Sequence, residues 1–131
     1  MRIFAAKVTA SAHCDLPCGV YDPAQARIEA ESVKAIQEKY QGNEDPDFRI
    51  RAIQIKEQRA ELVKHHLDVL WTDYFKAPHF EKYPQLHTLF NDATKAAGAS
   101  GVKGSNDPKT GQKLLDLIAE IDKIFWETKQ A

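Results

Sequence analysis

Residues 107–128 read DPKTGQKLLDLIAEIDKIFWET and form the clearest helical segment of the chain. Apolar side chains recur there at steps of three and four, at Leu114, Leu117, Ile118, Ile121 and Phe125. Such spacing lines one face of an α-helix with apolar groups, and that face needs a partner to cover it. Asp is a favourable N-cap, and Pro suits the first helical position because its missing N–H would be unpaired there anyway. We therefore predict an amphipathic helix from Pro108 to about Thr128.

Two other Asp-Pro dipeptides, at residues 22–23 and 45–46, predict two more helix starts on the same grounds. The first of these helices extends to Gln41. Gly42 then supplies a stop, because glycine tolerates the left-handed conformation that ends many helices. The second helix can continue to about Phe75, just before an Ala-Pro pair at residues 77–78.

A further helix is predicted to begin around Pro84 and to end before Gly98, and the Gly-, Ser- and Lys-rich residues 98–106 predict a surface loop. The inner face predicted for the first helix comprises Ala26, Glu29 or Ala30, Val33, Ile36 and Tyr40. The inner face predicted for the second comprises Phe48, Ala52, Ile55, Arg59, Leu62, His66 and Val69. Four amphipathic helices with mostly short connections favour an all-α, antiparallel four-helix bundle over residues 23–131.

Length and composition fit one soluble domain. The chain has 131 residues, of which 43% are apolar and 28% charged, both ordinary values for a globular protein. Its 18 basic and 19 acidic residues give a net charge of −1, which argues against nucleic-acid binding. No apolar run approaches the roughly 18 residues that a membrane span requires. We expect neither a nucleic-acid nor a membrane partner, and a cytoplasmic location.

The first twelve residues, MRIFAAKVTASA, differ in character from the rest of the chain. A basic residue precedes a short apolar patch, and Ala10-Ser11-Ala12 resembles a small-residue cleavage site. A secretory signal needs an apolar core of roughly 7–15 residues, and Lys7 interrupts the patch. We therefore predict that residues 1–12 are a removable pro-segment. An export signal cleaved before release and a frayed terminus of no consequence are the alternatives.

Residues 13–22, which we call the arm, read HCDLPCGVYD and contain both cysteines of the chain, Cys14 and Cys18. Two cysteines cannot form a disulfide framework, and a bridge between them would close a very small loop of little stabilising value. A local disulfide or a pair of free thiols is therefore one interpretation of the arm. A metal site is the other.

Cleavage after Ala12 would make His13 the N-terminal residue and would create a cluster of metal donors. His13 would offer an α-amine and an imidazole, Cys14 a backbone nitrogen and a thiolate, and Cys18 a second thiolate. Adjoining chelate rings of this kind hold a metal in a plane, which suits nickel(II) or copper(II). Two thiolates tend to reduce copper(II), so the donor set favours nickel and makes a higher oxidation state accessible.

Residues 13–21, HCDLPCGVY, are similar to the nickel-binding hook of the nickel-containing superoxide dismutases, and the resemblance extends through residues 22–29 and 124–129. It implies that two superoxide anions become dioxygen and hydrogen peroxide while nickel alternates between Ni(II) and Ni(III). It also implies one nickel ion per subunit, a homohexamer of four-helix bundles, and a maturation protease that removes residues 1–12.

The same resemblance implies the site residues. The His13 amine, the Cys14 amide nitrogen and the sulfurs of Cys14 and Cys18 would form the metal plane. The His13 imidazole would join as an axial ligand in the oxidised state. Residues 13–22 would then be the nickel-binding hook, and residues 23–131 the bundle that carries it.

Four further residues are candidates for roles around the metal. Glu29 and Arg59 fall on the predicted inner faces of two helices, where an ion pair would avoid two isolated buried charges. A purely structural pair is the alternative, but the resemblance implies that both hold the His13 imidazole, as outer-shell groups commonly do. Tyr21 and Tyr74 are implied beside the open nickel face, where a hydroxyl can meet a small anion. A packed aromatic is the alternative for each.

The remaining polar candidates are weaker. Lys76 either attracts the anion or is simply solvated. The histidines outside the arm lack convincing ligand spacing, so we predict structural or surface roles for His65, His66, His79 and His87. Aromatic residues gather at the end of the second helix, and we expect them in the core or at subunit interfaces: Trp71, Tyr74, Phe75, Phe80 and Tyr83.

Two other classes of function compete with a nickel redox enzyme. A nickel or copper carrier would use the same donors to bind a metal and hand it on. A helical interaction module would carry the cysteines as an incidental disulfide.

Overall fold

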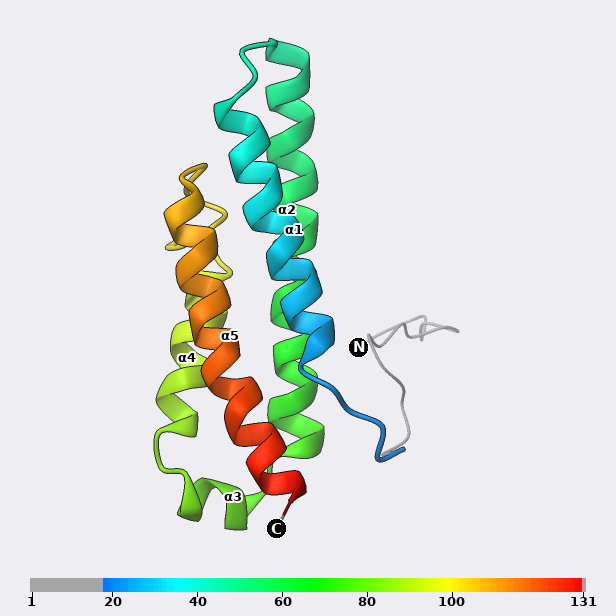
Figure 1. Cartoon of the computed structure of the whole chain (residues 1–131), viewed down its shortest axis with the longest axis vertical. Coiled ribbons are helices and arrows are strands. Elements are labelled where there is room, and N and C mark those ends of the chain that lie inside the picture. The colour runs from blue at the N-terminus through cyan, green and yellow to red at the C-terminus, as the bar shows by residue number, and fades with distance from the viewer. Residues whose placement is uncertain (1–17, 131) are drawn as a thin grey trace, which may run out of the picture.

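Helices are the only regular secondary structure that the computed structural model contains in the residues it describes, 18–130. The long helices are α1 (Ala24–Gln41), α2 (Pro46–Val69), α4 (Leu86–Ala96) and α5 (Pro108–Lys129). A π-helical turn, η1 (Leu70–Tyr74), continues α2, and the short α3 (Ala77–Lys82) comes next. Successive long helices run in opposite directions, so the predicted antiparallel four-helix bundle is confirmed (Figure 1). The predicted pro-segment lies outside the described residues.

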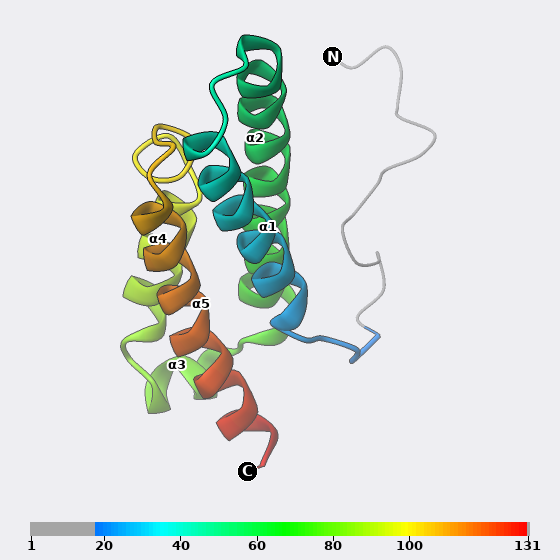
Figure 2. The same ribbon diagram turned by 45° about the horizontal axis from the view of Figure 1, so that its top comes forward.

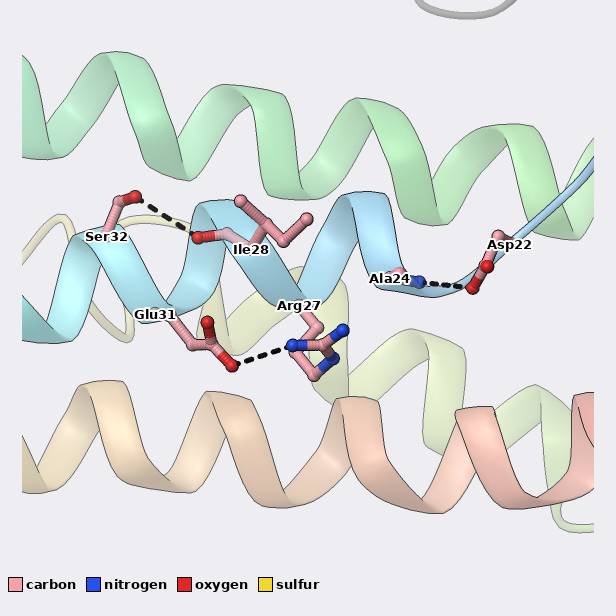
Figure 3. A network of polar contacts seen from close by, with 6 residues as sticks. All are labelled: Asp22, Ala24, Arg27, Ile28, Glu31 and Ser32. Carbon is pink, nitrogen blue, oxygen red and sulfur yellow. Dashed lines mark hydrogen bonds and ion pairs between the residues drawn. The ribbon is translucent and has the colours of Figure 1, made fainter.

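The helix starts predicted at Asp45-Pro46 and Asp107-Pro108 are confirmed, whereas α1 begins one residue later than predicted, with Pro23 as its N-cap. The Asp45 side chain accepts a hydrogen bond from the Asp47 N–H at 3.2 Å, and Asp107 accepts one from the Lys109 N–H at 3.0 Å. At the start of α1, Asp22 Oδ1 accepts from the Ala24 N–H at 2.8 Å, as Figure 3 shows. Each carboxylate thereby satisfies a backbone donor that has no partner within its helix.

The end of α1 differs from the prediction. Gly42 has a φ of −88°, so it does not adopt the left-handed conformation that we expected of it. Its N–H donates to the Glu38 carbonyl at 3.3 Å, and the chain then turns toward the cap of α2. There the Asn43 side chain accepts from the Asp45 N–H at 2.8 Å. The end of α1 is therefore accompanied by side-chain capping at the start of α2, and not by a left-handed Gly42.

The inner face predicted for the second helix is wrong by one residue over most of its length. Ala52 is buried as predicted, but Ile55 is 37% exposed and Arg59 lies at the edge of the bundle. The buried face of α2 comprises Ala52, Lys56, Ala60, Val63 and Leu67. The spacing of apolar residues did not indicate this face, because it contains a lysine and two alanines. The short α3 was not predicted either.

The four long helices lie side by side, as Figure 2 shows, and apolar side chains from all of them fill the centre of the bundle. The largest contributions from the two C-terminal helices are Leu86, Phe90, Leu114, Ile118, Ile121 and Phe125, each at most 4% exposed. Helix α5 packs against both α1 and α4 and so connects these two helices in the bundle. Within residues 18–130, none of the helices has the length and apolar composition that a membrane span requires.

Residues 98–106 do form a loop, but part of it is packed rather than superficial. Val102 is fully buried in the core. The ammonium group of Lys56, a residue only 1% exposed, donates to the Ser105 carbonyl and to Asn106 Oδ1, both at 2.7 Å. Gln37 of α1 donates to the same Ser105 carbonyl at 3.1 Å. The loop is therefore held to α1 and α2 by hydrogen bonds.

Lys56 yields a prediction about alkaline pH. Burial lowers the pKa of Lys56 below its usual value of 10.5, against a weaker opposing effect of Glu57. Between that lowered pKa and 10.5 the unfolded chain holds more protons than the folded one, so stability rises with pH. The free energy of unfolding of the wild type should therefore increase relative to that of Lys56→Met as the pH approaches 10.5. The gain is about 1.4 kcal/mol for each tenfold weakening of proton binding.

Urea denaturation at a series of pH values measures this difference. Lys123→Met, on the outer part of α5 away from the core, is the matched control for the loss of a positive charge. Parallel pH curves for the wild type and Lys56→Met would contradict the prediction.

Candidate functional site

The arm enters the described part of the chain at Cys18, whose side chain is exposed. The Val20 N–H donates to the Cys18 sulfur at 3.4 Å. Gly19 between them has a φ of 75°, in the left-handed region that glycine adopts at little cost. This turn folds the backbone around the sulfur. His13 and Cys14, the other predicted metal ligands, lie outside the described residues.

A pocket adjoins this end of the arm. It is lined by Gly19, Tyr21, Asp73, Tyr74, Lys76, His79 and Lys129. These residues come from the arm, from η1, from α3 and the residue before it, and from the last turn of α5. In Figure 1 the arm lies toward the same end of the bundle as α3 and the C-terminus of α5. The pocket therefore exists only because the fold brings these segments together.

The π-helical turn decides where Tyr74 lies. Leu70 and Phe75, five residues apart, are 3% and 4% exposed, and the Phe75 N–H donates to the Leu70 carbonyl at 2.9 Å. In a continuous α-helix the buried position after Leu70 would fall at Tyr74, four residues on. Because the π turn contains one extra residue, Phe75 occupies the buried position instead. Tyr74 is left partly exposed at the pocket. Single π turns are often found at functional sites.

The two predicted tyrosines meet at the pocket. The rings of Tyr21 and Tyr74 lie 5.8 Å apart at 58°, so the arm is packed against the end of α2 through this contact. On another side the His79 imidazole stacks on Tyr74 at 5.6 Å and 11°. The Tyr74 hydroxyl lies 2.6 Å from Thr128 Oγ1, at the C-terminal end of α5. Tyr74 is thus held by three different elements.

The charge of the pocket is positive on balance. The Lys129 ammonium lies 5.0 Å from the centre of the Tyr74 ring, Lys76 lines the same pocket, and Asp73 is the one acidic residue in the lining. Two ammonium groups against one carboxylate favour the approach of a small anion. The sequence pattern singled out only Lys76 for this role. Lys129 is far from the other charged groups of the pocket in sequence, so no spacing pattern could reveal it.

The predicted ion pair between α1 and α2 is present. Arg59 Nη1 lies 3.1 Å and 3.4 Å from the two carboxylate oxygens of Glu29. The Glu29 side chain is 17% exposed, but that of Arg59 is 39% exposed. The prediction that Arg59 lies on the inner face is therefore wrong, and water screens part of the attraction. The pair sits at the edge of the bundle and is open to an additional partner.

The other histidines form no metal cluster. Among residues 18–130 no group of three or more His, Cys, Asp or Glu side chains is close enough to hold a metal ion. The His79 Nδ1 accepts from the Lys76 N–H at 3.1 Å, and His87 packs against Trp71 at 5.6 Å. Of the histidines in the described part of the chain, His79 alone lines the pocket beside the arm.

The aromatic cluster predicted at the end of the second helix is confirmed. Trp71 packs on Phe80 at 4.9 Å and on Phe90 at 5.3 Å. Phe75 contacts the same two rings at 6.4 Å and 5.5 Å. These rings join the end of α2 to α3 and α4, and they form the apolar wall behind Tyr74.

The residues of the arm fit a nickel ion. Cys18 presents a soft sulfur donor at an exposed position rather than packing it into the core. The N–H hydrogen bond from Val20 to that sulfur is an outer-shell contact of the kind that tunes thiolate ligands. Sulfur and nitrogen donors together, with no carboxylate among them, suit a late transition metal better than calcium or magnesium.

Comparison with known proteins agrees with this chemistry. The family model of nickel-containing superoxide dismutase matches residues 8–129. The nickel superoxide dismutases of Streptomyces coelicolor and Streptomyces seoulensis are each 75% identical over 130 residues, which is 99% of this chain and 98% of theirs.

Solved structures show the same architecture. A native nickel superoxide dismutase matches with a TM-score of 0.88 at 75% identity, over 91% of this chain and all of the other. A structure with nickel ligation corresponding to the oxidised state also matches at 0.88, with 76% identity over the same shares of the two chains. An apo structure matches at 0.83, with 73% identity over 86% of this chain and all of the other.

Proposed function

Because the chain belongs to the family of nickel-containing superoxide dismutases, we propose that His13, Cys14 and Cys18 hold its nickel ion. The protein is an oxidoreductase that converts two superoxide anions and two protons into dioxygen and hydrogen peroxide, with nickel as its cofactor. The observation that carries the ligand assignment is the exposed Cys18 sulfur, turned back by Gly19 beside the anion-attracting pocket. His13 and Cys14 join it as the remaining soft and nitrogen donors of the arm.

Bound nickel supplies the one-electron couple between Ni(II) and Ni(III) on which dismutation depends. The protein's own residues bring the anion to it. Lys76 and Lys129 raise the local concentration of superoxide by their positive charge. Tyr21 and Tyr74 line the pocket, where their hydroxyl oxygens can form hydrogen bonds with the protonated peroxide product. The aromatic rings around them limit the access of larger molecules.

Glu29 and Arg59 are proposed to position the metal ligand His13. The carboxylate of Glu29 is the acceptor in the pair and can receive the imidazole N–H of His13 as well as the guanidinium. Such a contact would fix the ring in one orientation and make it a stronger donor to the metal. The partial exposure of the pair supports this role, because a fully enclosed pair would have no open side.

Three proposals concern the protein in the cell. A maturation protease removes residues 1–12 and thereby creates the His13 amine. The mature chains form a homohexamer, for which Ile28, Ile50 and Ile55 offer exposed apolar area on α1 and α2. The enzyme acts in the cytoplasm, with export after cleavage of the leader as the alternative. Fractionation of the native cells tests the location.

Native mass spectrometry of the protein from its own cells tests processing, metal content and assembly together. We expect a hexamer of chains that begin at His13, with one nickel ion in each. Chain that keeps Ala12 should fold as a bundle but show no dismutase activity with added nickel, because the nitrogen of His13 is then an amide. Full activity of the unprocessed chain would refute the proposed amine ligand.

Replacing Cys18 with Ser tests the ligand that lies within the described structure. Cys18→Ser should abolish dismutase activity and leave the helix content unchanged, because the bundle does not depend on Cys18 for its core. The apo structure of a relative, which shares the fold, supports that independence. Circular dichroism and a superoxide assay measure the two effects. Val20→Ser, at a neighbouring side chain that is 69% exposed, should leave both unchanged. An active Cys18→Ser enzyme would exclude this ligand set.

Glu29→Ala should lower activity without abolishing it, since an orienting group is lost and no ligand is removed. The variant should lose no more than about 1 kcal/mol of stability, because Arg59 keeps access to water. Electron paramagnetic resonance of the oxidised enzyme should show weaker or heterogeneous coupling to the axial nitrogen.

Glu31→Ala is the matched control. It removes an exposed ion pair with Arg27 at 2.9 Å on the same helix, which Figure 3 shows. Only Glu29→Ala should alter the resonance spectrum. If both variants keep wild-type spectra and activity, Glu29 does not act on His13.

A further inference from the structure

The C-terminal end of α5 makes a hydrogen-bonded chain with the pocket that the proposed function does not use. The Thr128 hydroxyl donates to the Phe125 carbonyl at 2.6 Å. The same hydroxyl oxygen lies 2.6 Å from the Tyr74 hydroxyl. Phe125 is buried, and its ring packs on Tyr74 at 4.4 Å, so both ends of this chain are held in place.

The number of protons available on each group fixes the direction of these hydrogen bonds. A threonine hydroxyl has one proton, and a backbone carbonyl can only accept. Because Thr128 gives its proton to the Phe125 carbonyl, it can only accept from Tyr74. The phenolic proton of Tyr74 therefore points toward α5, and the Tyr74 oxygen can act toward the pocket only as an acceptor.

We infer that Thr128 is a positioning residue for Tyr74: it accepts the phenolic proton and so fixes the orientation of the hydroxyl at the pocket. In this arrangement Tyr74 accepts a hydrogen bond from the protonated peroxide product and has no proton to give to the superoxide anion. The inference rests on the proposed role of Tyr74 beside the metal. It adds to the machinery of the site a residue 54 positions away in the chain.

The surroundings of Thr128 support a specific role for its hydroxyl. Thr128 lies one residue before the end of α5, where the helix gains little from an internal side-chain bond. Lys129, its neighbour in sequence, places its ammonium 5.0 Å from the centre of the Tyr74 ring and 5.5 Å from that of Phe125. The last turn of α5 thus contacts Tyr74 through both a hydroxyl and a cation.

The test compares Thr128→Val, Thr128→Ser and Tyr74→Phe with the wild type, all as processed, nickel-loaded enzyme and again after nickel removal. Ultraviolet resonance Raman spectra report whether a phenol donates or accepts through the intensity ratio of the tyrosine doublet. Subtracting the Tyr74→Phe spectrum isolates Tyr74 from the other tyrosines of the chain. Thr128→Val should change that ratio in both forms, and Thr128→Ser should restore it. The value of kcat/KM should fall about two- to tenfold in Thr128→Val, as for the loss of one hydrogen bond, and recover in Thr128→Ser.

Thr94→Val is the matched control, because Thr94 of α4, which does not line the pocket, makes the same kind of bond to a helix carbonyl, that of Phe90, at 2.8 Å. It should leave both readouts at wild-type values. One outcome would overturn the inference and leave the proposed role of Tyr74 intact. In it, Tyr74→Phe is slow, but Thr128→Val changes neither the Tyr74 spectrum nor kcat/KM. Full activity of Tyr74→Phe would instead remove the proposed role of Tyr74 and the inference with it. Equal losses in Thr128→Ser and Thr128→Val would also overturn it, since the hydroxyl would then have no part in the effect.

Discussion

Burial of the apolar face of α5 between α1 and α4 is the constraint on which the rest of the structure depends. Leu114, Ile118, Ile121 and Phe125 lie along one side of this helix and are at most 1% exposed. Once that face is buried, the helix cannot rotate or slide without exposing it. Its last turn is therefore carried to a fixed place beside η1. The core thereby fixes the positions of Thr128 and Lys129 at the pocket, because both lie within one helical turn of Phe125.

The domain separates stability from chemistry. Apolar packing among the four long helices accounts for the fold, and Cys18, the proposed metal ligand within the described residues, takes no part in it. The described part of the arm has other features: the Cys18 sulfur is exposed and Gly19 adopts a left-handed conformation. The Tyr21–Tyr74 contact attaches this part of the arm to the bundle.

Polar groups in the bundle act at its edges and at one buried point. The Glu29–Arg59 pair and the lysines of the pocket keep access to water, so their charges remain effective without a large desolvation cost. Lys56 is the exception among the charged residues that the structure describes, since its ammonium is buried and held by two loop oxygens. It joins α2 to the 98–106 loop at the end of the bundle away from α3. The charged groups of the pocket and the buried ammonium that holds the loop therefore lie in different parts of the bundle.

The four long helices and the proposed metal donors could be predicted from the sequence, because both depend on residues close together in the chain. An Asp-Pro dipeptide caps a helix through bonds within two residues, and the donors His13, Cys14 and Cys18 lie within one short stretch of chain. The inner face of α2 was predicted one residue off, because its true face contains Lys56 and small alanines that carry little hydrophobic signal. The tertiary structure alone decided that Tyr74 leaves the core through a π turn and that Lys129 and Thr128 reach it. Those contacts join residues far apart in the chain, and no periodicity encodes them; they arise when side chains from different helices compete for the same core.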